Sequence, residues 1–245
     1  MRLFVSGGAG FIGSNFIRCA LRSSRNYSVV NYDRLTYAAN LANLKTVERD
    51  PRYRFVKGDV CDTSGVETAM RGCEGVIHFA AESHVDRSIY EPTPVIETNV
   101  AGTLILLQAA GRIGIKRFAH ISTDEVYGDL PQETFADEKS PLKPSNPYAA
   151  SKAAADLLVL SFVRTYGMPA LITRSSHNYG PHQFPEKFLP LLISNALVGK
   201  LLPICGDGKQ QRDWLHVDDN CGGILAVLER GRIGEIYNLG GARRN

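Results

Sequence analysis

The sequence lacks a long apolar run, a paired cysteine motif and any strong excess of charge. No apolar stretch approaches the ~20 residues that a membrane helix needs, so we expect no membrane span. The net charge is +3, from 28 basic and 25 acidic residues, which is too small to indicate a nucleic-acid or membrane partner. Because Arg2–Ser6 already has the composition of a first core strand, we also expect no signal peptide.

The five cysteines show no pattern typical of a disulfide framework or a zinc site. Their number is odd, and no two of them stand in C-x-x-C spacing. We therefore expect core or surface thiols, no bound metal, and the reducing environment of the cytoplasm. The residues concerned are Cys19, Cys61, Cys73, Cys205 and Cys221.

What the sequence does contain is an alternation of short β-branched runs and helical stretches. Its 245 residues, 44% of them hydrophobic, suffice for one large α/β domain or for a domain with a small lobe. The alternation predicts a Rossmann-type α/β fold, a doubly wound parallel sheet with helices on both faces. The expected strands are Leu3–Ser6, Ser28–Tyr32, Arg54–Lys57, Gly75–Phe79, Phe118–Ser122 and Leu171–Thr173. The expected helices are Phe11–Leu21, Val66–Arg71, Val95–Ala110 and Tyr148–Tyr166.

The alternation changes after about Ser175, where prolines and a turn signal become frequent. We therefore expect a main domain at residues 1–175 and a smaller lobe at 176–245, laid over the sheet edge where a substrate could be gripped. The Val217–Arg230 helix and the Glu235–Leu239 strand are expected to return to the main domain. The features that mark the change are Pro181, Pro185, Pro190, Pro203 and Gly206-Asp207-Gly208.

A glycine-rich turn follows the first expected strand and opens the first expected helix. Gly7, Gly10 and Gly13 let the backbone turn tightly and approach a pyrophosphate, which the helix N-terminus attracts. Asp33 ends the second strand, where a carboxylate bonds the adenosine ribose and repels a 2′-phosphate. The pattern predicts an NAD site, against the alternative of a tight turn that holds no ligand. Arg34 is the one neighbour that would favour NADP.

Two more strand ends fit the same cofactor, although each could be an ordinary loop. Asp59-Val60 follows the third strand at the height of the adenine. Phe79-Ala80-Ala81 ends the fourth strand with small residues that let the backbone pass close to the cofactor. The cofactor-binding residues expected so far are Gly7, Gly10, Phe11, Ile12, Gly13, Asp33, Arg34, Leu35, Thr36, Asp59, Val60, Phe79, Ala80 and Ala81.

Tyr148 and Lys152 stand four residues apart in an expected helix and therefore share one face. Lys152 can lower the pKa of Tyr148, which could then take a substrate hydroxyl proton while hydride passes to a nicotinamide cofactor. Since Y-x-x-x-K is common by chance, the alternative is a half-buried tyrosine beside a surface lysine. The glycine turn upstream supports the catalytic interpretation of the pair.

Thr123-Asp124-Glu125 follows the Phe118–Ser122 strand, at the edge where open α/β sheets bind ligands. The Thr123 hydroxyl can bond a reacting oxygen, and the two acids can remove one proton and protonate a leaving hydroxyl. Adjacent acids at a strand end more often face water or cap a helix. Beside a hydride-transfer site, however, they predict oxidation followed by loss of water.

Six segments that span nearly the whole chain have the composition and spacing of a known family. They are Gly7–Asn15, His78–Ile89, Ser122–Gly128, Tyr148–Leu158, Asn178–Lys187 and Arg212–Asp219. The chain thus resembles the extended short-chain dehydrogenase/reductases and, among them, most closely the dTDP-glucose 4,6-dehydratases. Threonine followed by Asp-Glu distinguishes these dehydratases from the sugar epimerases of the superfamily, which lack the carboxylate pair.

The resemblance implies a mechanism in three steps. Tyr148 deprotonates the glucose 4-hydroxyl while hydride leaves C4 for NAD, and Thr123 bonds the same oxygen. Glu125 then removes the C5 proton while Asp124 protonates the departing 6-hydroxyl. Hydride finally returns to C6, so NAD is regenerated. The scheme needs a protonated Asp124 and an ionised Glu125, a division that neighbouring carboxyl groups can reach.

The resemblance also implies the remaining contacts. Ser83, Thr98, Asn178, Tyr148 and Lys152 would join the cofactor site, and a homodimer would form through the Val95–Ala110 and Tyr148–Tyr166 helices. Residues 1–175 would bind NAD and carry the catalytic groups, and 176–245 would bind mainly the nucleotide sugar. The implied substrate-binding residues are Ser83, Thr123, His177, Lys187, Phe188, Pro203, Ile204, Cys205 and Arg212, with Arg212 on the diphosphate.

Three departures from the family pattern leave the nucleotide open. His177 stands where Asn is usual, Cys205 stands where Tyr is common, and family members continue past residue 245 into segments that complete the nucleotide pocket. The runner-up is therefore a 4,6-dehydratase for UDP-glucose or another nucleotide sugar. A 4-epimerase, which the Asp124-Glu125 pair argues against, and a non-catalytic NAD-binding scaffold are the further alternatives.

Overall fold

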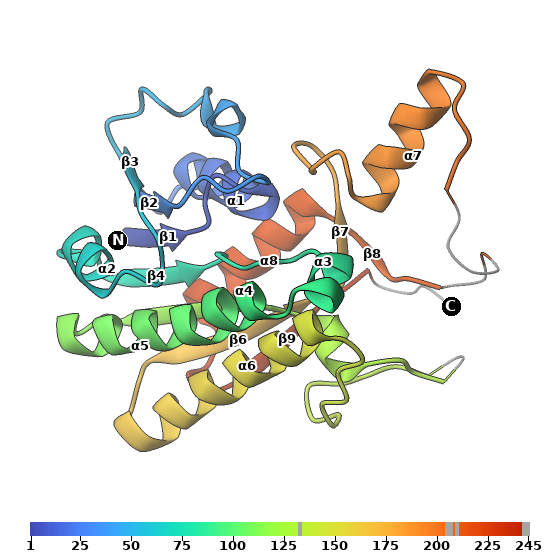
Figure 1. Ribbon diagram of the computed structural model, residues 1–245. Helices are drawn as coiled ribbons and strands as arrows, with labels where there is room; N and C mark the ends of the chain where they lie inside the picture. Colours follow the sequence, from blue (N-terminus) through green and yellow to red (C-terminus); the bar gives the residue numbers. More distant parts are fainter. Residues whose placement is uncertain (132–133, 204–207, 209–210, 242–245) are drawn as a thin grey trace.

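A seven-stranded parallel sheet forms the centre of the molecule (Figure 1). The computed structural model describes residues 1–131, 134–203, 208 and 211–241. In spatial order the strands are β3 (Tyr53–Lys57), β2 (Ser28–Asp33), β1 (Arg2–Ser6), β4 (Gly75–His78), β5 (Arg117–Thr123), β6 (Ala170–Ser175) and β9 (Ile236–Leu239). The chain runs outward from β1 in one direction and then returns to continue from β4 in the other. Ligands bind at such switch points in open α/β sheets, so the fold itself locates a site between β1 and β4.

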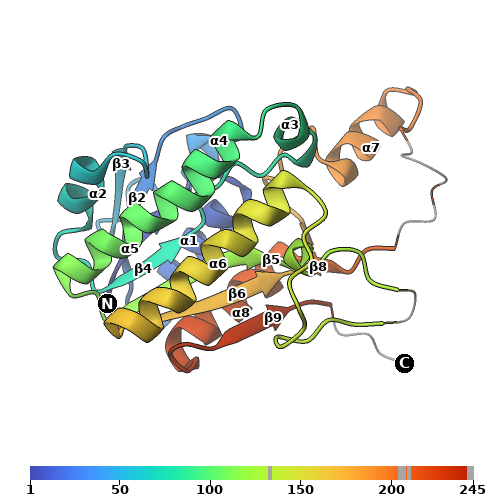
Figure 2. The same cartoon turned by 60° about the horizontal axis from the view of Figure 1, so that its bottom comes forward.

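Helices cover both faces of this sheet. On one face lie α1 (Phe11–Arg22) and α8 (Val217–Arg230), and on the other lie α2 (Thr63–Met70), α5 (Gly102–Ile113) and α6 (Pro147–Tyr166). Figure 2 shows α5 and α6 side by side across the second face. Alternate residues of one strand serve the two cores, because Leu3 and Val5 pack with α1 while Phe4 packs with α2 and α5. The predicted α/β fold with a doubly wound parallel sheet is therefore confirmed.

The expected Val95–Ala110 helix is wrong as a single regular element. The structure has a short α4 (Thr93–Val95), a π-helical stretch (Ile96–Ala101) and then α5. The wider turn brings the buried Asn99 side chain to both the N–H and the carbonyl of Glu82, at 2.8 and 3.0 Å, and to the Ser151 hydroxyl at 2.8 Å. Such insertions are set by tertiary bonds near functional sites, and the hydrophobic period of the sequence does not report them.

Several short elements were not predicted. They are η1 (Leu41–Leu44), α3 (Val85–Tyr90), η3 (Asp124–Tyr127), β7 (His177–Tyr179), α7 (Phe188–Leu197) and β8 (Trp214–His216). Strands β7 and β8 pair with each other in parallel, outside the main sheet. Helix α7 has no buried residue and stands away from the sheet (Figure 1).

The last part of the chain returns to the main sheet. Helix α8 packs with α1, and β9 pairs with β6 from Ile236 opposite Ile172 to Leu239 opposite Ser175. The division into residues 1–175 and 176–245 stays a prediction.

Candidate active site

A cleft with a volume of about 350 Å³ lies along the carboxyl ends of β1, β2, β4, β5 and β6. It brings together most of the residues predicted for cofactor, substrate and chemistry. Those that line it are Gly7, Gly10, Phe11, Ile12, Gly13, Asp33, Arg34, Thr36, Asp59, Val60, Phe79, Ala80, Ala81, Ser83, Thr98, Thr123, Asp124, Glu125, Tyr148, Lys152, His177, Asn178 and Lys187. The sequence analysis missed Tyr32, Ala38, Ala39, Gly58, Glu82, Ile121, Ser122, Ser175, Ser176, Gln183 and Phe184.

The glycine turn between β1 and α1 leaves room that a side chain would fill. Gly7 has φ +73°, and a Cβ there would lie 2.5 Å from the backbone nitrogen of Ala80. A Cβ on Gly13 would collide with the Gly7 carbonyl. Gly10 caps α1 without a side-chain hydrogen bond, so the first N–H groups of the helix stay open toward the cleft. The turn therefore fits a dinucleotide pyrophosphate, which needs close backbone approach and N–H donors.

The adenosine end of the cleft is built around Asp33. Its Oδ2 accepts a hydrogen bond from the N–H of Ala9 and its Oδ1 accepts one from the N–H of Leu35, both at 2.8 Å. Burial raises the pKa of Asp33, while these two bonds lower it. Each carboxylate oxygen keeps a second lone pair for a ribose hydroxyl. Leu35 itself does not line the cleft and contributes only its backbone.

Arg34, the residue that would favour a 2′-phosphate, is paired. Its Nη1 lies 3.1 Å from Oδ2 of Asp59. The ion pair offsets the positive charge beside Asp33, so the geometry favours NAD over NADP.

Tyr148 and Lys152 lie on α6, which Asn146 caps by accepting a hydrogen bond from the N–H of Ala149 at 2.8 Å. The Lys152 ammonium donates to the carbonyl of Ile121 at 2.6 Å, and burial lowers the pKa of Lys152 to about 8. The pKa of Tyr148 is raised, first by burial and then by Glu125 and Asp124. The expected lowering by Lys152 is therefore not seen in this geometry, since burial and the two carboxylates raise the pKa of Tyr148.

Thr123 arranges the two acids that follow it. It ends β5 and caps η3, where its Oγ1 accepts a hydrogen bond from the N–H of Glu125 and donates to Oδ1 of Asp124, both at 3.3 Å. Burial raises the pKa of Asp124 to about 6 and also raises that of Glu125. For Glu125 this rise is opposed first by the charge of His177 and then by a hydrogen bond from Nδ2 of Asn146 to Oε2 of Glu125, at 3.4 Å, whereas for Asp124 it is opposed first by the Thr123 hydroxyl. The surroundings thus favour protonated Asp124 beside ionised Glu125.

A buried polar network behind the Tyr/Lys pair was not predicted. Nε of Arg174 donates to Oδ2 of Asp156 at 2.8 Å, and its Nη1 donates to the Tyr127 hydroxyl at 2.9 Å. The charge of Asp156 favours the protonated form of Lys152. Asp156 follows Lys152 by four residues, and this helical spacing was the available signal in the sequence.

The expected substrate-binding residues divide between the cleft and its surroundings. Ser83, Thr123, His177 and Lys187 line the cleft, and the Lys187 ammonium donates to the Ser83 carbonyl at 3.0 Å. Three other residues do not line it. They are Phe188, Pro203 and Arg212. The ring of Phe188 stacks on that of Trp214, and Nη1 of Arg212 donates to the Gln211 carbonyl at 2.8 Å. Ile204 and Cys205 lie outside the described residues.

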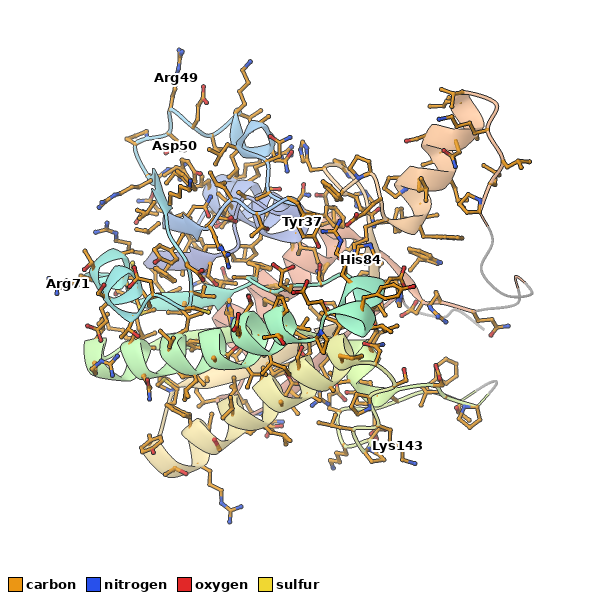
Figure 3. All side chains as sticks on the ribbon, viewed as in Figure 1. Tyr37, Arg49, Asp50, Arg71, His84 and Lys143 are labelled. Carbon is orange, nitrogen blue, oxygen red and sulfur yellow. The ribbon has the colours of Figure 1, made fainter. Side chains whose placement is uncertain are left out.

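Side chains from three segments meet at the mouth of the cleft. Nη2 of Arg87 donates to Glu186 at 2.9 Å while its guanidinium lies 3.8 Å from the centre of the Tyr37 ring. Nε2 of His84 lies 3.6 Å from the same glutamate. Figure 3 shows Tyr37 and His84 close to this region, whereas Arg49 and Arg71 project from the outer edge. A cation–π contact and an ion pair thus join the loop after β2, α3 and the loop before α7.

The described part of the chain offers neither a cluster of metal ligands nor a membrane-spanning helix. Across residues 1–131, 134–203, 208 and 211–241, no three His, Cys, Asp or Glu side chains gather as metal ligands. Within the same ranges, each helix is too short or too polar for a membrane span.

Comparison with known proteins places the chain in a family. The model of the NAD dependent epimerase/dehydratase family matches residues 3–240. The chain belongs to this family. The predicted membership of the extended short-chain dehydrogenase/reductases and the predicted NAD cofactor are thereby confirmed.

The similar proteins include dehydratases and epimerases. A dTDP-glucose 4,6-dehydratase from Streptomyces niveus is 49% identical over 245 residues, covering 98% of this chain and 73% of the relative. The structure of DesIV, a dTDP-glucose 4,6-dehydratase from Streptomyces venezuelae with NAD bound, has a TM-score of 0.95 at 51% identity, over 99% of this chain and 76% of that one. A UDP-glucuronic acid 4-epimerase from Bacillus cereus with NAD bound has a TM-score of 0.93 at 32% identity, over 99% and 78%. The fold alone therefore does not separate dehydration from epimerisation.

Proposed function

We propose that the protein dehydrates dTDP-glucose to dTDP-4-keto-6-deoxyglucose. The observation that carries this proposal is the Asp124-Glu125 pair, held in one cleft with Tyr148 and Lys152 beside a glycine turn that fits a dinucleotide. Epimerisation at C4 needs oxidation and reduction but no second acid and base. The similarity to dTDP-glucose 4,6-dehydratases, 48% to 49% identical over 98% of this chain, supports the same reaction.

The first half of the reaction falls to Tyr148, Thr123 and Lys152. NAD, when bound, supplies an oxidised nicotinamide that accepts hydride and carries a positive charge. Tyr148 takes the proton of the 4-hydroxyl as C4 becomes a ketone, and Thr123 holds the same oxygen. Lys152, fixed by the Ile121 carbonyl on the same helix face as Tyr148, would stabilise the deprotonated phenol together with the positive charge of bound NAD.

The second half falls to the two carboxyl groups. The C4 ketone acidifies the C5 proton, which Glu125 removes. The electron pair forms the C5–C6 double bond, and the C6–O bond breaks as Asp124 protonates the departing hydroxyl to water. C6 is then reduced, Glu125 returns its proton to C5, and the cofactor ends in its starting oxidation state.

The remaining expectations extend the proposal. Residues 1–175 bind NAD and supply the catalytic groups, and 176–245 contact mainly the nucleotide sugar through His177 and Lys187. The protein acts in the cytoplasm as a homodimer built on the α5 and α6 helices. A dehydratase for UDP-glucose is the second candidate, because Cys205 stands where the family commonly has Tyr.

Product analysis tests this function directly. The full chain, with NAD, is incubated separately with dTDP-glucose and UDP-glucose, and mass spectrometry follows each nucleotide sugar. We expect loss of one water from dTDP-glucose and much slower loss from UDP-glucose, with neither reaction in the Tyr148→Phe variant. A change in sugar configuration without a change in mass would establish an epimerase instead, and preferential loss of water from UDP-glucose would correct the substrate.

A further inference from the structure

His177 occupies a position in the cleft that the reaction scheme does not use. It begins β7, where its N–H donates to the Asp213 carbonyl at 3.0 Å, and its ring packs edge-on to Trp214 with 5.7 Å between the ring centres. These contacts fix the imidazole so that Nδ1 lies 3.9 Å from Oδ2 of Asp124. This Nδ1 is buried and has no hydrogen-bond partner among the residues that the structure describes. That carboxylate oxygen belongs to the proposed acid.

Charged groups surround His177 on every side that packs against it. Burial and the cations favour its neutral form, and the carboxylates favour its protonated form, with Glu125 the strongest of them. The pKa of His177 is lowered by burial first, whereas burial raises that of Asp124 to about 6. The facing charges are Asp124 and Glu125 from η3, Lys187 from the segment before α7, and Arg212 and Asp213 from the segment before β8.

These observations place two titratable groups with opposite pKa shifts in one buried corner of the cleft. Burial raises the pKa of Asp124 and lowers that of His177, which brings the two closer together, and the buried Nδ1 lies 3.9 Å from the Asp124 carboxyl group. We propose that His177 and Asp124 hold one exchangeable proton between them, and that His177 is a positioning residue that keeps Asp124 supplied with the proton for the leaving 6-hydroxyl. This inference rests on the proposed dehydration, in which Asp124 acts as the acid.

The proton balance follows from that arrangement. When Asp124 gives its proton to the departing hydroxyl, water leaves and the carboxylate faces the imidazole. The pair is then a carboxylate beside a neutral imidazole. Solvent delivers the next proton, which His177 can take up and pass to Asp124. The one-proton state of a coupled pair persists to higher pH than the protonated state of either group alone. The acid is therefore available at a pH where an isolated Asp124 would be largely ionised.

A pH profile of the elimination step tests the proposal. In single turnovers of dTDP-glucose, oxidation at C4 is followed by reduced-nicotinamide absorbance and elimination by rapid-quench mass spectrometry. In His177→Asn the alkaline limb of elimination should move down by about one pH unit, roughly tenfold in rate on that limb, with the profile of C4 oxidation unmoved. His216→Asn is the matched control, since His216 pairs in the same small sheet and lies outside the cleft lining. It should move neither profile.

A titration tests the pair without relying on turnover. With NAD bound, the imidazole of His177 is followed by NMR in the wild-type protein and in Asp124→Asn. Loss of the facing carboxylate should lower the titration midpoint of His177 by about half a pH unit or more. An unchanged midpoint, or coinciding elimination profiles for His177→Asn and the wild type, would overturn the inference. Absence of any dehydrated sugar from the wild type would instead overturn the proposed function, and the titration would still decide whether the pair exists.

Discussion

Asp124 and Glu125 are adjacent in sequence but meet different partners. Asp124 faces Thr123 and His177, while Glu125 accepts a hydrogen bond from the side-chain amide of Asn146. Asn146 also caps α6. The helix cap thus ties the base to the element that carries Tyr148. Two carboxyl groups with the same chemistry acquire different tasks because their neighbours differ.

This division predicts separate defects in single variants. Asp124→Asn cannot protonate a leaving group and Glu125→Gln cannot accept the C5 proton, so each should slow loss of water by about 10²- to 10⁴-fold. Both should still oxidise C4 and accumulate reduced nicotinamide with 4-ketoglucose. Rapid-quench mass spectrometry with absorbance follows both species in one turnover. The surface variant Glu67→Gln should behave as the wild type. Equal slowing of oxidation and water loss in both acid variants would assign the pair to binding or structure.

The residues that sequence analysis could find are those with local spacing. Tyr148 and Lys152 share a helix face, and Thr123-Asp124-Glu125 ends a strand, so each pattern could be placed without the fold. The ion pair of Asp156 with Arg174 could not, because β6 reaches α6 only through tertiary packing. The pKa of Tyr148 was expected to fall, and burial together with two carboxylates raises it. The direction of such a pKa shift depends on burial and on distances between charges, which a sequence does not supply.

At the scale of the element, the β1–α1 turn decides whether a dinucleotide can approach. Gly7→Ala places a methyl group against the backbone of Ala80 at a left-handed φ, so we expect NAD affinity to fall by at least about tenfold. Calorimetric titration with NAD measures the change. Gly222→Ala on α8 is the matched control, because nothing lies within 4 Å of its Cβ. It should leave affinity unchanged and stabilise the fold by about 0.5–1 kcal/mol. Wild-type affinity in Gly7→Ala would show that the turn is not the pyrophosphate site.

The central sheet strands β1, β2, β4, β5 and β6 were found from sequence because they are short runs whose residues are mostly buried. The elements that were missed draw their stability from elsewhere. Strands β7 and β8 have three residues each and exist through mutual pairing, and the π-helical stretch is set by the bonds of Asn99. The secondary-structure propensity of a short segment does not reveal such tertiary partners.

At the scale of the whole molecule, two buried histidines lie in the centre of the sheet. The rings of His78 and His120 are 5.3 Å apart, and His78 bonds Ser6 at 2.8 Å and Thr103 at 2.9 Å. Burial, with a contribution from Lys152, lowers the pKa of His78 from 6.5 to about 3 and that of His120 well below 6.5. The folded protein therefore keeps both imidazoles neutral where an unfolded chain would protonate them.

This difference predicts how stability depends on pH. The contribution of each histidine is complete above pH 6.5 and is lost as the pH falls below it, at about 1.4 kcal/mol per pH unit for each, and for His78 this loss continues toward about pH 3. Chemical denaturation at several pH values measures the slope. His78→Asn should reduce the slope of unfolding free energy against pH. Thr103→Val should lower the unfolding free energy at every pH and leave that slope unchanged. An identical slope in His78→Asn would mean that other groups control the acid sensitivity.

The short turn η3 carries the acid pair and shares no residue with the glycine cradle that fits the coenzyme. The acid pair and the glycine cradle are therefore encoded by separate stretches of the gene. After a duplication, the codons for Asp124 and Glu125 can drift in one copy while the codons of the cradle remain under selection. The protein encoded by that copy would keep the oxidation step and lose the elimination step, and it would remain folded throughout. The likeness to a Bacillus cereus epimerase, at 32% identity with a TM-score of 0.93, is the trace such a history would leave.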